Sequence, residues 1–279
     1  MAALLLFACM DTTTKFLTGR YSVPMVVAVR YIVQCLLMVA VWGPSQGRQL
    51  VRTQRTSLVL VRAASLAAAS LFMGLALQRM PVAETTAINF LSPMLVVLLA
   101  GPILQEQIGA LGWAAVVTGF IGVLLIARPG GGLDLTGIAF ALCAVCASVA
   151  YQLLSRVLAR TEQTVALLFY SALLGSIGFG IFLPWSSDGV SPSFSEWLLL
   201  LSMGLTGGLG HFLFTAAYRH ASASLLAPMT YIQLLWAGLL GWTVFGHVPD
   251  HLSTIGMAVV AASGVMIALK SRFRGNRQG

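Results

Sequence analysis

The sequence predicts an all-α membrane protein, in which ten transmembrane helices form two inverted five-helix repeats around a central cavity. Three observations carry this prediction: the composition, the length of the apolar runs, and a repeat between the two halves. Apolar residues make up 58% of the 279 residues and charged residues only 9%, against about 25% in an ordinary soluble domain. So few charges cannot cover a water-exposed surface, which excludes a soluble enzyme, a secreted module and a disordered chain.

Apolar runs of about 20 residues, the length that a membrane-spanning helix needs, begin at the N-terminus. They are too long for the ten-residue alternation of barrel strands, so we expect helices. The first five spans are expected at residues 1–18, 24–43, 58–78, 82–101 and 109–127. Prolines stand at or near their boundaries, at Pro24, Pro44, Pro81 and Pro129. The first span is short, which leaves open a start upstream of Met1.

The second half of the chain has the same organisation. Its five spans are expected at residues 135–155, 164–184, 196–217, 222–243 and 252–270. Pro192 and Pro249 lie in the loops before the eighth and tenth spans. All the loops are short, and none is long enough to fold by itself, so the helices should pack as one bundle.

The distribution of Lys and Arg predicts the orientation. If the N-terminus is cytoplasmic, the inside segments hold Arg48, Arg52, Arg55, Arg62, Arg156, Arg160, Arg219, Lys270, Arg272, Arg274 and Arg277. The outside loops then hold only Arg20, Arg79 and Arg128. By the positive-inside rule both termini are cytoplasmic. The net charge of +8 is explained by these clusters, and no basic face interleaved with aromatic residues points to a nucleic acid.

The two halves resemble each other. A shift of about 141 residues superposes Lys15 on Arg156 and Ala76 on Ala217. We therefore expect a first repeat over residues 1–132, a second over 133–270, and a basic cytoplasmic tail over 271–279. Because five spans is an odd number, the second repeat enters the membrane upside down relative to the first. Inverted repeats place a substrate site near mid-membrane and allow alternating access.

The chain resembles the EamA-type transporters of the drug/metabolite transporter superfamily. The resemblance rests on GFIGVLLIARPG at the end of the first half, and on WAGLLGWTVFGHVPD and IGMAVVAASGVMIALKSR in the second. It implies ten helices around a central cavity, alternating access, a bacterial inner-membrane location, and transport of amino acids, other small metabolites or drugs, commonly outward. The family usually has an acidic residue after the Phe-Gly of the ninth helix. Here that residue is His247, whereas the first half keeps Glu106.

Charged residues inside spans are the first candidates for a substrate site, because they are costly in a bilayer. Asp11 and Lys15 lie one turn apart on one helix face, where they can pair. Arg30 lies about a third of the way into the second span, with Gln34 one turn further on. Together these charges sum to +1, which suits a solute with a carboxylate or phosphate, and a guanidinium matches such a group well. The alternative is that Lys15 and Arg30 extend to the interface.

Two further ionisable residues are candidates for gating or proton coupling. Glu84 lies in the first turn of the fourth span, where a carboxylate stabilises a helix N-terminus, so a structural role competes with proton coupling. His211 lies among glycines in the eighth span, and packing with hydrogen bonding competes there with a proton relay.

The fourth and ninth spans supply polar and aromatic candidates near a helix break. Pro93 and Pro228 remove helical hydrogen bonds, as in the broken helices of transporters. Near them we expect Asn89, Tyr231, Gln233 and Trp236 to bind substrate. Asn89 could instead hydrogen-bond between helices, and the two aromatic residues could simply pack.

These residues predict a secondary transporter, in the exporting direction, of a small polar metabolite such as an amino acid or an organic anion. A lipid flippase is the alternative, and an integral-membrane enzyme fits less well because no converging catalytic set is present. Nothing resembles a nucleotide-binding loop, so the solute gradient or protons would drive transport. We expect no cofactor and no metal, the lipid bilayer and a small solute as partners, and a monomer or homodimer.

Overall fold

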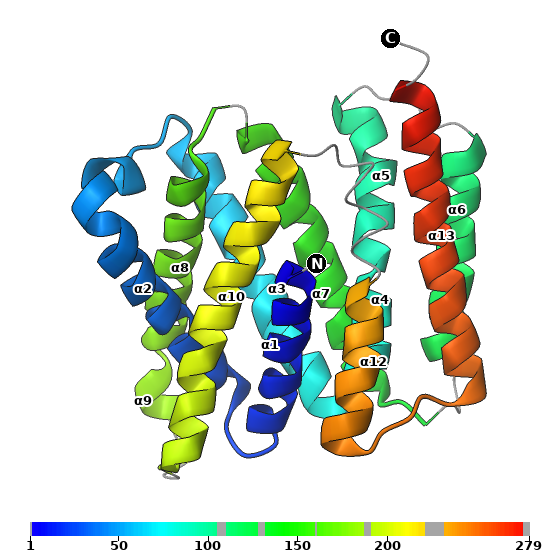
Figure 1. The fold of residues 1–279 in the computed structure, drawn as a ribbon, viewed down its shortest axis with the longest axis horizontal. Helices are drawn as coiled ribbons and strands as arrows, with labels where there is room; N and C mark the ends of the chain where they lie inside the picture. Colours follow the sequence, from blue (N-terminus) through cyan, green and yellow to red (C-terminus); the bar gives the residue numbers. More distant parts are fainter. Residues whose placement is uncertain are drawn as a thin grey trace.

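The computed structural model describes residues 2–104, 110–127, 132–159, 161–186, 191–220 and 232–275. Within these ranges the chain is helical apart from short turns and loops, and it has no β-strand there. The helices stand side by side along one common direction (Figure 1). The predicted all-α class is therefore confirmed.

The helices follow the expected spans in order. The first half contains α1 (Ala2–Thr18), α2 (Val23–Val51), α3 (Thr56–Arg79), α4 (Val82–Asn89), α5 (Leu91–Leu104) and α6 (Ala110–Ala127). The second half contains α7 (Leu135–Leu158), α8 (Thr164–Gly180), α9 (Leu183–Ser186), α10 (Phe194–His220), α12 (Ile232–Phe245) and α13 (His251–Gly275). Among the described residues α2, α3, α7 and α10 are long and apolar enough to cross a membrane, and several shorter helices are also apolar. The count of ten crossings stays a prediction.

The fourth span is broken into two helices, and the break lies at Phe90 rather than at Pro93. Pro93 has no N–H group, so it cannot donate to the carbonyl of Asn89 one turn earlier. The Ser92 hydroxyl donates to that carbonyl instead, at 2.8 Å. Phe90 adopts φ −68° and ψ −3°, which ends α4 before α5 begins. The proline therefore acts on the turn that precedes it.

The second span is longer than its apolar run. We expected it to end before Pro44, but α2 continues to Val51 with a kink at Gln46 (φ −132°, ψ 20°). The last two turns are mostly polar and exposed, and only Leu50 among them is buried. A polar extension of this kind carries Arg48 beyond the apolar part of the helix.

The most extensive helix contacts pair each half with the other. They join α3 to α7, α6 to α13, α2 to α8 and α1 to α10. In Figure 1, α2, α8 and α10 form one side of the bundle, α6 and α13 form the other, and α4, α5 and α12 lie between them. The core is therefore built between the two halves rather than within each one.

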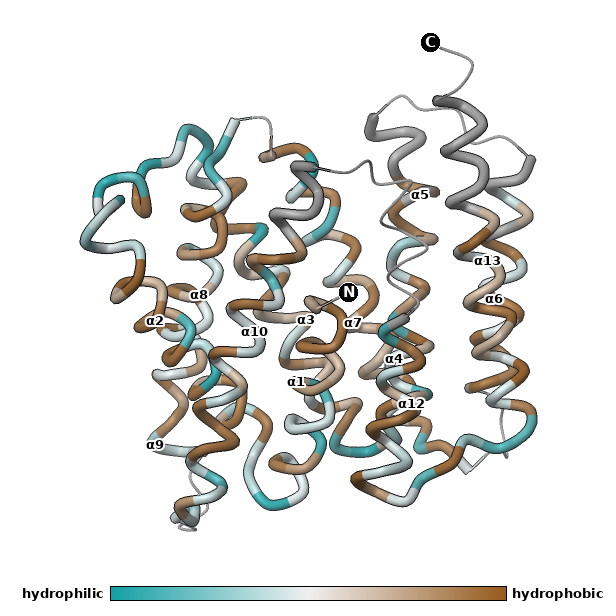
Figure 2. The backbone as a smooth tube through the Cα atoms, in the orientation of Figure 1, coloured by the Kyte–Doolittle hydropathy of each residue, from teal (hydrophilic) through white to brown (hydrophobic). Residues whose placement is uncertain are grey.

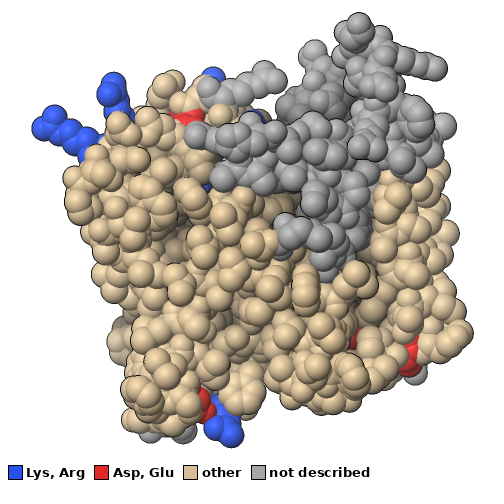
Figure 3. All heavy atoms as spheres, in the orientation of Figure 1, with Lys and Arg blue, Asp and Glu red and all other residues tan. Residues whose placement is uncertain are grey.

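The surface is apolar along the helices and polar at their ends. Figure 2 shows teal segments gathered mainly in the connections at both ends of the bundle. In Figure 3 the described Lys and Arg in view lie toward the two ends of the bundle, and the described surface between them is mostly tan. Large apolar side chains such as Leu36, Val117 and Leu205 are more than half exposed. Exposed apolar surface of this extent fits contact with lipid rather than water.

Glycine permits the close contact between α6 and α13. A Cβ atom added to Gly256 would lie 2.6 Å from the carbonyl oxygen of Gly122, and one added to Gly122 would lie 2.8 Å from the carbonyl oxygen of Gly256. Both obstacles are backbone atoms, so neither can rotate away. Small residues at such crossings allow helices in membranes to approach closely.

Gly256→Ala is accordingly expected to destabilise the protein by about 1–3 kcal/mol, since overpacking forces the two helices apart. Thermal unfolding of the detergent-solubilised protein measures the effect. Gly238→Ala on α12 is the matched control, because no atom lies within 4 Å of an added Cβ there. Equal melting temperatures for the two variants would contradict close packing of α6 on α13.

Candidate functional site

Arg30 on α2 is a buried cation with unused hydrogen-bonding capacity. Its side chain is 6% exposed, and its guanidinium stacks 4.4 Å above the ring of Tyr31. One nitrogen, Nη1, lies 3.3 Å from the sulfur of Met10. Nε and Nη2 are buried and donate to no atom of the residues that the structure describes. A buried charged donor without an acceptor is costly, which makes this guanidinium a candidate for binding an anion.

Asp11 on α1 lies beside Arg30 and connects the two halves of the chain. It is 6% exposed, and its Oδ2 accepts a hydrogen bond from Nε2 of Gln233 at 3.3 Å. Arg30 is close enough to act on it electrostatically. Three predicted site residues, the buried Asp11 and Arg30 and the half-buried Gln233, are thus brought together from α1, α2 and α12.

Lys15 does not pair with Asp11, although the two lie one turn apart. Its Nζ donates to the carbonyl oxygens of Leu77 at 3.0 Å and Met80 at 2.7 Å. These carbonyls belong to the C-terminal turn of α3, where a cation stabilises the free acceptors. The structure therefore gives Lys15 a capping contact on α3.

Glu84 pairs with His247, so the first half of the chain contacts the second at this end of the bundle. Oε1 of Glu84 lies 2.9 Å from Nε2 of His247. The carboxylate is 2% exposed, and its Oε2 has no hydrogen-bond partner among the described residues. Glu84 lies in the first turn of α4, where a carboxylate stabilises a helix N-terminus, so the structural role and the coupling role both remain open for it. The residue that departs from the family pattern, His247, is thus the partner of this acid.

Among the other predicted site residues, His211 lies near enough to Arg30 to interact with it electrostatically. Asn89 ends α4, where its Oδ1 lies 3.4 Å from the Ser92 hydroxyl. His211 packs edge-on against Phe7, at 4.9 Å between ring centroids, and Trp236 is half-buried on α12. Tyr231 and Pro228 lie outside the described residues.

Arg62 on α3 is a polar residue that the sequence analysis placed in a cytoplasmic segment. It is 1% exposed. Its nitrogens donate to Ser155 Oγ at 2.7 Å, Leu167 O at 2.9 Å, Ser171 Oγ at 3.0 Å and Tyr151 OH at 3.1 Å. Its position four residues inside the span predicted at residues 58–78 is the feature of the sequence that could have indicated a buried role. Unlike Arg30, every nitrogen of this guanidinium has a hydrogen-bond partner, and the side chain joins α3 to α7 and α8.

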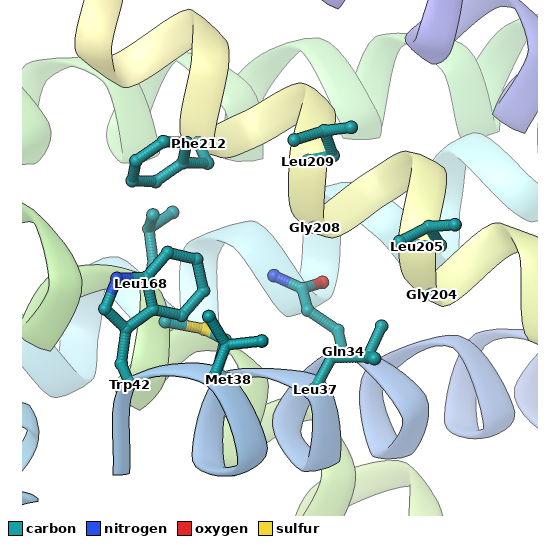
Figure 4. A pocket seen from close by; sticks show the side chains of 11 residues that line it. Gln34, Leu37, Met38, Trp42, Leu168, Gly204, Leu205, Gly208, Leu209 and Phe212 are labelled. Carbon is teal, nitrogen blue, oxygen red and sulfur yellow. The ribbon is translucent and has the colours of Figure 1, made fainter. Parts of the chain in front are cut away.

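A hollow of about 250 Å³ lies between α2, α8 and α10. Figure 4 shows Trp42 and Met38 from α2, Leu168 from α8 and Phe212 from α10 around it, with the amide of Gln34 between α2 and α10. Its outer residues include Leu37, Val41, Leu205 and Leu209, which are 36–59% exposed. The hollow therefore opens sideways, toward the surface that lipid would cover.

No group of three or more His, Cys, Asp or Glu side chains gathers as a metal site in the described part of the chain. The cysteines it contains, Cys9, Cys35, Cys143 and Cys146, are free thiols.

Comparison with known proteins gives a family match over nearly the whole chain. The profile of the EamA-like transporter family matches residues 1–128 and again residues 135–269. A solved structure with 20% sequence identity shares the fold, with a TM-score of 0.66 over 97% of both chains.

Curated relatives are named as transporters of different solutes. A riboflavin transporter of Brucella anthropi is 25% identical over 96% of both chains. A pseudopaline exporter of Pseudomonas aeruginosa is 29% identical over 69% of this chain and 68% of its own. An S-adenosylmethionine uptake transporter of Rickettsia conorii is 26% identical over 71% of this chain and 67% of its own.

Proposed function

The chain belongs to the EamA-like transporter family of integral, multi-pass membrane proteins, and from this premise we propose that it is a secondary transporter of a small organic anion. Membership of this family makes the protein a transporter and not an enzyme. The solute class, the direction and the mechanism are what we add here.

The observation that carries the proposal is the guanidinium of Arg30. It is buried inside a bundle that is apolar outside, and two of its nitrogens have no acceptor among the described residues. A carboxylate or phosphate supplies two oxygens in the plane of such a fork. An ionised Asp11 would balance the charge of Arg30 when no solute is bound. An arriving anion would compete with Asp11 for Arg30.

Competition between a bound anion and Asp11 for Arg30 could change the conformation of the protein through Asp11. Its hydrogen bond to Gln233 joins α1 to α12 across the two halves. When a bound anion engages Arg30, protonation or displacement of Asp11 would weaken that link. A proton taken up by Asp11 would also couple the solute to the proton gradient, which is the driving force that we propose.

The packing supports alternating access between two inverted repeats. Each helix of the first half has a counterpart five spans later: α1 corresponds to α7, α2 to α8, α3 to α10 and α6 to α13. When each helix is replaced by its counterpart, the α1–α10 contact becomes the α7–α3 contact, which is also present. The α2–α8 and α6–α13 contacts each join a helix to its own counterpart and stay the same. The loops follow the same exchange. Tyr21, before α2, donates to Glu196 at the start of α10, and Glu162, before α8, accepts from the backbone of Arg55 at the start of α3. A two-fold relation of this kind lets one fold open toward either side.

The Glu84–His247 pair is a suitable contact for closing one end. It joins the N-terminus of α4 to the loop after α12, and Lys15 lies near enough to act electrostatically with Glu84. In the orientation with both termini in the cytoplasm of a bacterial inner membrane, this end faces outward. Separation of the pair would open the site to the outside and release the solute, as proposed for export.

Counterflow in proteoliposomes tests the proposal. Purified protein is reconstituted with a panel of unlabelled organic acids, amino acids and neutral nucleosides inside, and uptake of the labelled counterpart is measured. We expect exchange for an acid and none for the nucleosides. Asp11→Asn, which keeps the Gln233 contact but cannot ionise, should retain exchange and lose acceleration by a pH gradient. The matched control is Asp250→Asn.

Two results would contradict this function. Exchange of a neutral solute that is unaffected by organic acids would exclude the anion class. An Asp11→Asn protein that responds to the pH gradient like the wild type would exclude Asp11 as the coupling group.

Lipid flipping is a second candidate because the hollow between α2 and α10 opens sideways, which a flippase requires. Dithionite bleaching of a fluorescent phospholipid in the same proteoliposomes separates the two functions. Bleaching of both leaflets, together with the absence of solute exchange, would favour the flippase.

A further inference from the structure

The hollow between α2, α8 and α10 is lined by an amide side chain, that of Gln34. Gln34 is 3% exposed, and its side chain extends from α2 toward the glycine residues of α10 (Figure 4). An amide both donates and accepts hydrogen bonds, so an occupant of this hollow can offer it a polar atom.

The other side chains that line the hollow are apolar and include two aromatic rings, so they favour a flat, apolar ligand. The rings of Trp42 and Phe212 lie 5.3 Å apart at 41°, and the buried side chains of Met38 and Leu168 lie beside them. A cavity of about 150 Å³ is enough for benzene. The 250 Å³ here can hold a larger ring system, against which aromatic and sulfur-containing side chains pack well.

Arg30 does not line the hollow, but it lies close to it along α2. Gln34 lies one helical turn beyond Arg30 on α2, which is a rise of about 6 Å. Both side chains lie against neighbouring glycines of α10. A Cβ added to Gly207 would lie 3.7 Å from Cδ of Arg30, and one added to Gly208 would lie 3.3 Å from Cγ of Gln34. Because Gly207 and Gly208 have no side chains, Arg30 and Gln34 can both lie close to the backbone of α10.

We propose that this hollow binds the ring system of an amphipathic aromatic acid, whose polar ring substituent bonds to Gln34 while its acidic group lies at Arg30. The inference rests on the proposed function and narrows its solute class from organic anions to acids that carry an aromatic group. It also assigns a specificity role to Trp42 and Phe212. The sideways opening past Leu205 and Leu209 lets such a molecule enter from the lipid phase.

Two probes that differ in charge test the proposal, 2-naphthylacetate and the neutral 2-naphthylmethanol. Their affinities are measured by calorimetry on the full-length protein in nanodiscs. The wild type should bind the acid more tightly than the alcohol. Leu209→Trp, which fills the opening, should weaken both by about tenfold or more, as loss of an apolar ring contact predicts. Arg30→Gln should weaken only the acid, to the level of the alcohol.

Leu201→Trp is the matched control, because Leu201 lies two turns earlier on α10 and is similarly exposed, at 46% against 44% for Leu209. If Leu209→Trp binds 2-naphthylacetate with the same affinity as Leu201→Trp, the proposed aromatic site is wrong. In that case, a loss of affinity in Arg30→Gln would still support the anion site. If Arg30→Gln leaves acid binding unchanged, the hollow and the anion site are separate and the amphipathic class is overturned. Failure of both probes to bind, with phospholipid retained by the wild type and lost from Leu209→Trp, would assign the hollow to a lipid chain instead.

Discussion

Replacement of Arg30 by glutamine is expected to reduce transport of an organic anion by about thirtyfold or more, because loss of a buried charged contact costs about 2 kcal/mol or more. Glutamine keeps much of the side-chain length, but it has neither the charge nor the planar fork. Lysine restores the charge as a single point, so Arg30→Lys should recover part of the activity. The measurement is the concentration dependence of counterflow in proteoliposomes, with the loss expected mainly in the apparent KM.

A second arginine on the same helix provides the control for this experiment. Arg48 is exposed on the polar extension of α2, so Arg48→Gln removes the same charge without reaching the buried group. Expression and melting temperature of both variants establish that they fold. If Arg30→Gln transports as well as Arg48→Gln, the guanidinium serves only to pack against Tyr31 and the proposed anion site is wrong.

Arg62→Ala is expected to lower the stability of the protein by about 3 kcal/mol. It would leave a cavity and remove charge-assisted hydrogen bonds. The four hydrogen bonds of this guanidinium join α3 to two other helices. For a chain of this size, that loss corresponds to a fall in melting temperature of roughly 6–12 °C. Thermal unfolding in detergent, followed by the fluorescence of the tryptophans, measures it.

Two comparisons make the Arg62 result specific. Arg52→Ala removes an exposed arginine and should leave the melting temperature nearly unchanged, as most surface substitutions do. Arg62→Met fills most of the volume without a charge, so it should be milder than Arg62→Ala, because no acidic partner among the described residues is left unpaired. A melting temperature for Arg62→Ala equal to that of Arg52→Ala would show that the hydrogen bonds of Arg62 contribute nothing net to stability.

The positions of the helices could be predicted because they depend on local properties of the chain. Apolar run length and proline placement predicted α1, α3, α6 and α7 to within a few residues. Two predicted helix boundaries, those at Pro93 and Pro44, differ from the structure. Both differences have local causes, but the structure was needed to identify them. Pro93 breaks the helix at Phe90 because the lost hydrogen bond is that of the preceding turn. Pro44 lies within α2, which continues as a polar helix past the apolar run.

The partners of the charged residues could not be predicted in the same way. Lys15 and Asp11 share a helix face, yet Lys15 donates to α3 and Asp11 accepts from α12. Glu84 and His247 are 163 residues apart in the sequence. Arg62 and Arg30 are both arginines within predicted spans. Nothing in the sequence distinguishes Arg62, whose nitrogens all have hydrogen-bond partners, from Arg30, two of whose nitrogens have none among the described residues.

The sequence by itself determined that this is a helical membrane protein of a transporter family, where its helices lie, and which few charges they carry into the apolar region. Only the tertiary structure decided which charges meet a partner and which remain available for a solute. The physical reason is that helix formation depends on neighbouring residues, whereas the environment of a side chain depends on the rotation of its helix and on the helices packed beside it. Arg30 and Gln34 became the leading candidates only once α10, with its glycines, was seen to lie against them.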